Sequence, residues 1–156
     1  MEQEEFAARV EAVYKRLYRT AYLYLGSEAD ALEAVDEAVY RGLKALGQLR
    51  EEEYFETWLT RILINVCHDQ LRRQKRFVPL EDAATLTADD FDSLPLKEAI
   101  RRLPKPLRDV VILRYFTDCT LAETAEILGI PPGTAATRQR KALQLLRLEL
   151  SEEVSE

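Results

Sequence analysis

Residues 120–147, TLAETAEILGIPPGTAATRQRKALQLLR, decide the fold of the C-terminal part of this 156-residue chain. Thr120, followed three residues later by Glu123, forms a capping box, which predicts a helix beginning at the next residue. Gly129 stands where a helix end favours a left-handed residue, and the two prolines that soon follow prevent continuation. A second helix is expected to begin near Gly133 or Thr134. The stretch therefore predicts two short helices around a tight turn.

The second of these helices has two chemically different faces. At about 100° per residue, small and apolar side chains gather on one side: Ala135, Ala142, Leu143 and Leu146. The opposite side carries Ala136, Thr137, Arg140, Lys141, Gln144 and Arg147. One face is expected to pack, while the other offers donors suited to phosphates and base edges, as in a DNA-binding helix-turn-helix. An ordinary helical hairpin with a solvated basic face is the alternative.

Composition limits the possible functions. A hydrophobic content of 47% allows one medium domain or two small ones, and no apolar run is long enough to span a bilayer, so we expect a cytoplasmic protein without membrane insertion. No metal-binding pattern is formed by Cys67, Cys119 and the single His68, so we expect a protein without a metal or a cofactor. No glycine-rich phosphate loop or activated nucleophile is present, which predicts that the protein is not an enzyme.

The net charge of −6 argues against a protein that coats nucleic acid by itself, because non-specific affinity comes from many Lys and Arg residues on phosphates. The charge is also unevenly distributed. A basic cluster lies at 72–76, the segment 81–92 is acidic, and the last helix is basic again. This layout predicts separate working surfaces and a second factor that brings the chain to DNA.

Three helices are expected in the N-terminal part. Apolar residues at steps of three and four predict a helix over 5–25 that ends at Gly26. Ser27 and Asp30 form a second capping box, opening a helix through Leu32, Val35 and Leu43 that Gly47 closes. The acidic outer face of this helix could be merely solvated or could dock on a basic partner. A third helix begins near Tyr54 and ends in the basic cluster.

The remaining segments predict a two-domain, all-α protein. Residues 78–94 contain Pro79 and many Asp, Thr and Ala residues without a sustained apolar period, so they are expected to form a flexible linker. The N-terminal domain then covers 1–77 and the helix-turn-helix domain 95–156. Short helices from Ser93 to residue 103 and over 107–116 are expected to support the helix-turn-helix, and the acidic tail SEEVSE is expected to fray.

Two stretches resemble the extracytoplasmic-function sigma factors of bacterial RNA polymerase, which belong to the sigma-70 family. In WLTRILINVCHDQLRR the matching positions are Trp58, Asn65, Asp69, Arg72 and Arg73. In LAETAEILGIPPGTAATR they are Glu123, Ala125, Leu128, Gly129, Gly133, Thr134 and Arg138. Both stretches occur in the family's order and spacing, and the resemblance covers nearly the whole chain.

The resemblance implies a factor that binds core RNA polymerase and directs initiation at specific promoters. The N-terminal domain would dock on the polymerase clamp through Asp30, Glu33, Asp36 and Glu37. It would open the −10 promoter element with Tyr54, Trp58, Arg61, Asn65, Arg72 and Arg73. The C-terminal domain would read the −35 element with Thr134, Thr137, Arg138, Arg140 and Lys141. An anti-sigma protein would be a further partner.

Departures from the family pattern keep two alternatives open. Asp36 replaces a usual Gln and Val39 a usual Phe in the docking helix, while Ala136 stands where a basic residue is frequent and Ile64 replaces another before Asn65. One alternative is a stand-alone helix-turn-helix regulator that binds duplex DNA without polymerase. The other is a degenerate relative that binds polymerase or an anti-sigma protein but no longer starts transcription.

Overall fold

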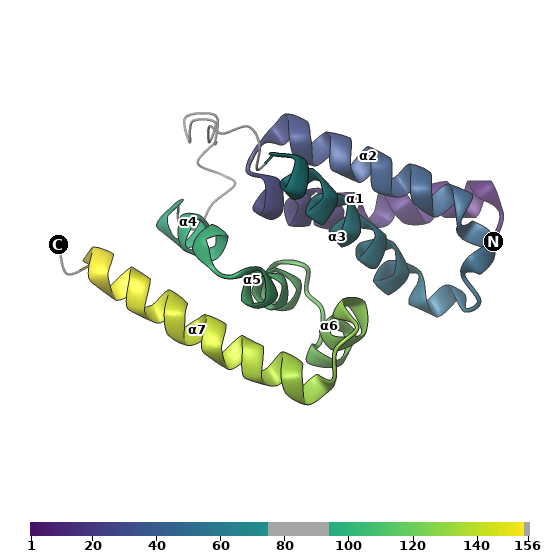
Figure 1. The fold of residues 1–156 in the computed structure, drawn as a ribbon. Helices are drawn as coiled ribbons and strands as arrows, with labels where there is room; N and C mark the ends of the chain where they lie inside the picture. Colours follow the sequence, from purple (N-terminus) through teal and green to yellow (C-terminus); the bar gives the residue numbers. More distant parts are fainter. Residues whose placement is uncertain (75–93, 155–156) are drawn as a thin grey trace. The chain divides into compact units, whose positions relative to one another are not determined.

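The computed structural model describes residues 1–74 and 94–154, and all of the regular structure there is helical. The chain divides into two compact units, Met1–Glu81 and Asp82–Glu156, whose helices are labelled in Figure 1. The predicted linker 78–94 lies outside the described residues except for Leu94, which is the first residue of helix α4. Each unit is described by itself.

The N-terminal unit is a three-helix arrangement of α1 (Gln3–Leu25), α2 (Glu28–Lys44) and α3 (Phe55–Gln74), in which each helix packs on the other two (Figure 1). Its core residues are large on α1 and α3, including Leu17, Leu59 and Leu63. Helix α2 contributes mostly small side chains, which lets its backbone approach the other two closely. The buried residues of α2 are Ala31, Ala34, Val35, Ala38 and Gly42.

Local signals fix the turn between α1 and α2. Gly26 ends α1 with φ 74°, a left-handed conformation that glycine adopts without steric cost, as the sequence predicts. The Ser27 hydroxyl accepts a hydrogen bond from the Asp30 backbone N–H at 3.3 Å, which confirms Ser27 as the N-cap. The carboxylate of Asp30 accepts from Nε2 of Gln74 on α3 at 3.0 Å, so this side chain also ties α2 to the end of α3.

The predicted end of α2 at Gly47 is wrong. The helix ends at Lys44, and the chain continues through two short 3₁₀ helices, η1 (Leu46–Gln48) and η2 (Glu52–Tyr54), into α3. A 3₁₀ turn satisfies the last carbonyls of a helix without a left-handed residue, so no glycine is needed there. Leu32 and Leu43, expected in the apolar stripe of α2, are 39% and 38% exposed.

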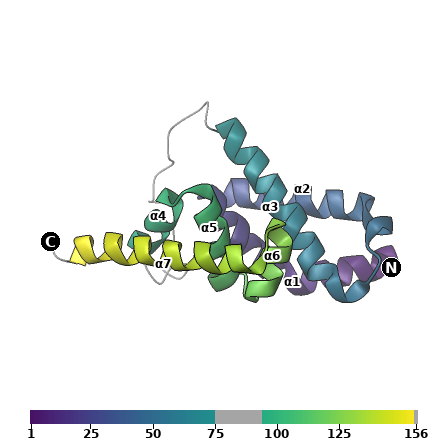
Figure 2. The same cartoon turned by 60° about the horizontal axis from the view of Figure 1, so that its bottom comes forward.

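Over its described residues, 94–154, the C-terminal unit contains four α-helices and a π-helical turn. Helices α4 (Leu94–Arg102), α5 (Lys105–Val111) and α6 (Leu121–Leu128) pack along the long helix α7 (Pro132–Val154), as Figure 2 shows. Helix α5 begins two residues earlier than predicted, because Pro106 fits the first turn, where a missing N–H is harmless. It continues as the π-helix η5 (Ile112–Phe116).

The helix-turn-helix has the caps that the sequence predicts. Thr120 Oγ1 accepts from Glu123 N at 3.1 Å, and Glu123 Oε1 accepts from Thr120 N at 2.8 Å, which completes the capping box. Gly129 ends α6 with φ 67°. Helix α7 begins at Pro132, one residue before the predicted range. It continues through Val154, so the tail predicted to begin at Ser151 starts within the helix.

Candidate nucleic-acid interface

One face of α7 packs against the rest of its unit and the other is exposed. Ala135, Ala142 and Leu146 are buried, as predicted, with 0%, 0% and 6% of their surfaces accessible. Thr137, Arg140 and Lys141 are exposed, and Thr134 and Arg138 are half-buried beside the packed face. Leu143, predicted on the packing side, is 37% exposed. The packing of three small or apolar residues therefore aims the polar face outward.

A hollow of about 680 Å³ opens at the start of α7. It brings together four of the five residues predicted to read DNA, namely Thr134, Thr137, Arg138 and Lys141. Arg140 does not line it and projects from the neighbouring part of the exposed face. The far wall comes from Pro106 and Leu107 of α5, which were not predicted to be part of this surface. Nothing in the local pattern of α5 indicated that its first turn reaches α7.

Arg114 of η5 braces α7 against the segment before α6. Its Nε donates to Oε1 of Gln139 at 3.0 Å, and its NH1 donates to the carbonyl oxygen of Cys119 at 2.9 Å. Gln139 lies between Arg138 and Arg140, so this bridge helps to set the rotation of the exposed face. The role of Arg114 was not predicted from the sequence, because its partners lie 5 and 25 residues away.

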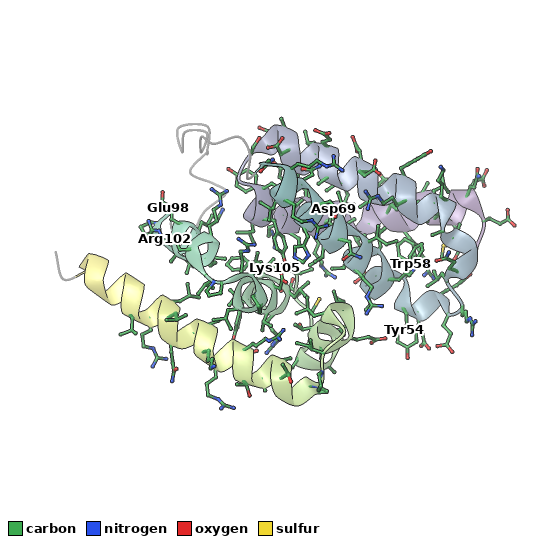
Figure 3. The ribbon with its side chains drawn as sticks, in the orientation of Figure 1. Tyr54, Trp58, Asp69, Glu98, Arg102 and Lys105 are labelled. Carbon is green, nitrogen blue, oxygen red and sulfur yellow. The ribbon has the colours of Figure 1, made fainter. Side chains whose placement is uncertain are left out.

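The second candidate surface runs along α3. Trp58, Arg61, Asn65 and Arg72 follow one another at steps of three, four and seven residues, which places them on one side of the helix. Arg61, Asn65 and Arg72 are exposed and Trp58 is half-buried. Figure 3 shows Tyr54 and Trp58 toward the N-terminal end of this helix and Asp69 further along it. The predicted set thus forms a continuous strip, apart from Arg73.

Aromatic residues at the start of α3 divide between core and surface. Phe55 is 2% exposed and contacts Phe6 edge to face, with 5.7 Å between ring centroids. Tyr54, the last residue of η2, is 48% exposed, so its ring is available to a ligand. Trp58 packs on Phe55 with 6.1 Å between centroids and has part of its surface accessible. Of the three, Tyr54 fits a stacking role best.

Acidic side chains of α2 line a groove of about 550 Å³ between α2 and α3. Three of the four residues predicted to bind polymerase lie there, namely Glu33, Asp36 and Glu37, whereas Asp30 does not line it. The α3 side is formed by Val66, Asp69, Gln70 and Arg73, so Arg73 belongs to this groove rather than to the strip with Asn65.

Arg41 crosses the groove and connects its walls. Its Nε donates to Glu37 Oε1 at 2.9 Å, and its NH1 lies 3.6 Å from Asp69 Oδ2. Asp69 also pairs with Arg72 on α3, the ion pair that the sequence allows at a spacing of three. The charges of α2 and those of the α3 strip are thus linked through Arg41 and Asp69.

An exposed apolar set lies beside the acidic residues of α2. Leu32, Tyr40 and Leu43 are 39%, 53% and 38% exposed, and the Lys44 ammonium lies 4.8 Å from the centre of the Tyr40 ring. Exposed apolar side chains that cluster near charged ones are typical of protein-binding surfaces. Both leucines were expected in the core, so this apolar surface was not predicted from the sequence.

The described residues contain no group of three His, Cys, Asp or Glu side chains that could hold a metal ion. Within the same ranges, no helix is both long and apolar enough to cross a membrane.

Comparison with known proteins matches each unit to a different part of one family. The model for sigma-70 region 2 matches residues 9–77, and the model for sigma-70 region 4 matches residues 93–148. The RNA polymerase sigma factor SigV of Bacillus subtilis is 33% identical over 141 residues, covering 87% of this chain and 85% of SigV. The extracytoplasmic-function sigma factor SigW of the same organism is 30% identical and covers 96% of this chain and 90% of SigW. The chain belongs to the extracytoplasmic-function sigma factors.

Solved structures agree with this family at the level of the fold. The sigma factor RpoE of Bartonella quintana, crystallised with the anti-sigma factor NepR, superimposes with a TM-score of 0.83, covering 95% of this chain and 98% of that one, at 22% identity. CnrH, solved with the cytosolic domain of CnrY, gives 0.79 and covers 97% of this chain and 90% of its own, at 23% identity. The family and the all-α fold predicted from the sequence are confirmed.

Proposed function

We propose that this sigma factor recruits core RNA polymerase to specific promoters, with α7 reading the −35 element and α3 holding the opened −10 element. The proposal rests on one observation: sigma-70 regions 2 and 4 occur in order in one chain. In each region, a helix packs one face in the core and leaves a polar face exposed. The factor acts in the cytoplasm and has no catalytic activity of its own, because polymerase supplies the chemistry.

The −35 element is read from the exposed face of α7. Arg140 can donate two parallel hydrogen bonds to a guanine edge in the major groove, whereas Arg138, half-buried at the rim of the hollow, suits a phosphate. The hydroxyl of Thr137 donates to the Gly133 carbonyl at 3.0 Å, which leaves its methyl group and oxygen lone pairs for a base. Thr134 and Lys141 line the same hollow and complete the surface.

The −10 element is held as an unpaired strand along α3. The exposed ring of Tyr54 offers a stacking surface, and Trp58 offers the accessible part of its indole. Asn65 can pair with the edge of an extruded base, while Arg61 and Arg72 supply positive charge on the same strip. Arg73 lines the groove between α2 and α3 and contacts the phosphate backbone of the strand from that side.

Polymerase docks on α2. The acidic Glu33, Asp36 and Glu37 attract a basic partner, and Leu32 and Tyr40 add exposed apolar surface for burial. Asp30 supports this surface through its bond to Gln74. The same exposed face is available to an anti-sigma protein, in keeping with the complexes formed by the two structural neighbours.

Transcription in vitro tests the proposal. Core polymerase with the purified protein, on a genomic fragment library, should give specific transcripts that neither component gives alone. Asn65→Ala should then reduce permanganate reactivity of the −10 region, and Arg19→Gln, on the exposed surface of α1, serves as a control. Specific duplex binding by the free protein, without transcripts, would instead identify a stand-alone regulator. Polymerase binding without transcripts would identify a degenerate relative.

A further inference from the structure

Four carboxylates surround the aromatic residue that we assign to the −10 strand. Glu51, Glu52, Glu53 and Glu56 flank Tyr54 in the sequence EEEYFE, and all four are exposed. Negative charge at this place stabilises α3, because the N-terminal end of a helix carries a partial positive charge. It also opposes the approach of a DNA strand, which is a polyanion. Negative charge in this segment therefore favours the start of α3 but opposes binding of the proposed DNA ligand.

Two arginines of α1 engage two of these four glutamates. Arg9 NH1 donates to the backbone carbonyl of Glu52 at 2.6 Å, and Arg9 NH2 lies 3.7 Å from the Glu52 carboxylate. The guanidinium of Arg9 also lies 5.6 Å from the centre of the Phe55 ring. Arg16, seven residues further along the same face of α1, donates to Glu56 Oε2 at 2.8 Å.

Fold stability does not account for these contacts. The side chains of Arg16 and Glu56 are 39% and 55% exposed, and those of Arg9 and Glu52 are 35% and 49% exposed. Exposed ion pairs typically add almost nothing to stability, because water screens them and both side chains lose freedom. What the two pairs do change is the charge next to Tyr54. They set two positive charges against Glu52 and Glu56 while leaving the Tyr54 ring 48% exposed. Arg9 NH2 also lies 3.6 Å from Glu5 Oε1, and the Met1 ammonium lies 3.8 Å from Glu52 Oε1.

We propose that Arg9 and Arg16 are positioning residues for the −10 strand: they neutralise Glu52 and Glu56 so that Tyr54 can receive single-stranded DNA. Arg9 has a second role, because its bond to the Glu52 carbonyl also fixes the backbone of η2 that carries Tyr54. The inference rests on the proposed function of the α3 strip.

Removing the charge of each partner of an ion pair, singly and together, distinguishes neutralisation of the glutamate from structural support by the arginine. The assay measures binding of a short fluorescent single strand by the complex of core polymerase with the full chain. The strand carries the −10 sequence that the wild-type complex selects from a random library. The variants are Arg16→Gln, Glu56→Gln and the double variant, with Arg19→Gln of the same charge change on α1 as the matched control.

Arg16→Gln should weaken binding about two- to fifteenfold at low salt, the effect of one extra unit charge roughly 10 Å from a phosphate at an effective dielectric between that of water and that of a protein surface. Glu56→Gln should tighten binding, and the double variant should return to the wild-type value. The loss should shrink as salt shortens the screening length. Arg9→Gln should be rescued only in part by Glu52→Gln, because the bond to the backbone carbonyl stays lost.

Three results would overturn the inference: no change for Arg16→Gln, a double variant as weak as Arg16→Gln, or an equal loss in Arg19→Gln. Tyr54→Ala and Asn65→Ala test the proposed function separately. If both bind the strand as the wild type does, the −10 assignment itself fails and the inference falls with it. If both weaken binding while Arg16→Gln does not, only the role of the α1 arginines is wrong.

Discussion

Replacement of Gly42 by valine should destabilise the N-terminal unit, because this glycine lets α2 approach α3 and α1. A Cβ atom at Gly42 would lie 3.0 Å from Cδ1 of Leu59 and 3.4 Å from the nearest carbon of the Phe6 ring. Both neighbours are core residues, with 0% and 3% of their surfaces exposed, so neither can move toward solvent. Overpacking of this kind costs about 1 to 3 kcal/mol. The better helix propensity of valine offsets roughly 0.3 kcal/mol of this cost, which leaves a net loss of about 0.7 to 2.7 kcal/mol.

Urea denaturation of the full chain, followed by the fluorescence of Trp58 in the N-terminal unit, measures this loss. Gly47→Ala is the matched control: the position has open space around it, so the change should stabilise by about 0.4 to 1 kcal/mol through the unfolded chain. In the background of Leu59→Ala, Gly42→Val should cost much less, because the clash partner is gone. If Gly42→Val is as stable as wild type, or if Leu59→Ala does not reduce its cost, the close-approach argument is refuted.

Three further changes test the C-terminal unit. Thr120→Ala should lower the free energy of unfolding by about 1 kcal/mol by removing half of the capping box, and Thr120→Ser should retain it, both measured by calorimetry. Asp118 has φ 58°, so Asp118→Gly should raise the thermal midpoint in the same experiment, whereas a decrease would show that its side chain is needed. Arg140→Ala should cost about 1 to 3 kcal/mol at one base pair of the −35 element in holoenzyme binding to single-base variants. If Arg138→Ala changes the preferred base instead, the roles assigned to these two arginines are reversed.

Features set by neighbouring residues could be predicted from the sequence. The left-handed ends at Gly26 and Gly129 and the Thr120–Glu123 capping box depend on atoms within one helical turn, and all three are present. The exposed face of α7 was also predicted correctly, because the buried Ala135 and Ala142 lie on the same side of the helix and leave the polar residues on the opposite side. The placement of Asn65 and Arg72 on one side of α3 follows in the same way from helical spacing alone.

The wrong predictions of burial concern residues at the edge of the apolar face of a helix, where burial depends on how wide the packed part of that face is. Leu143 lies only one residue, or about 100°, past the buried Ala142, and its side chain is 37% exposed. Leu32 and Leu43 were placed inside because they are large and apolar. The core side of α2 instead uses alanines and Gly42, since close backbone approach is what α1 and α3 allow. Sequence periodicity fixes the direction of a face but not its width.

The residues of the candidate site that the sequence did not predict make contacts between distant parts of the chain. Arg114 reaches Gln139 across 25 positions, and Arg9 reaches Glu52 across 43. Neither pair has a periodic signature, because each joins separate helices at a single point. Both arginines hold a segment that carries a proposed DNA contact without being placed in that contact themselves. In the sequence alone, each of these two arginines looks like an isolated surface charge.

The acidic net charge and the arginine bridges address the same physical requirement. A chain with a net charge of −6 gains little from non-specific attraction to DNA, so its affinity must come from a few contacts made after polymerase delivers it. Those contacts fail if acidic residues beside them repel the strand, and α3 keeps acidic residues at its start because they stabilise the helix. Pairing Glu52 and Glu56 with α1 lowers the repulsion at Tyr54 without adding free positive charge. The same surface can therefore remain weak toward DNA in the free protein and become effective only where polymerase holds the strand against it.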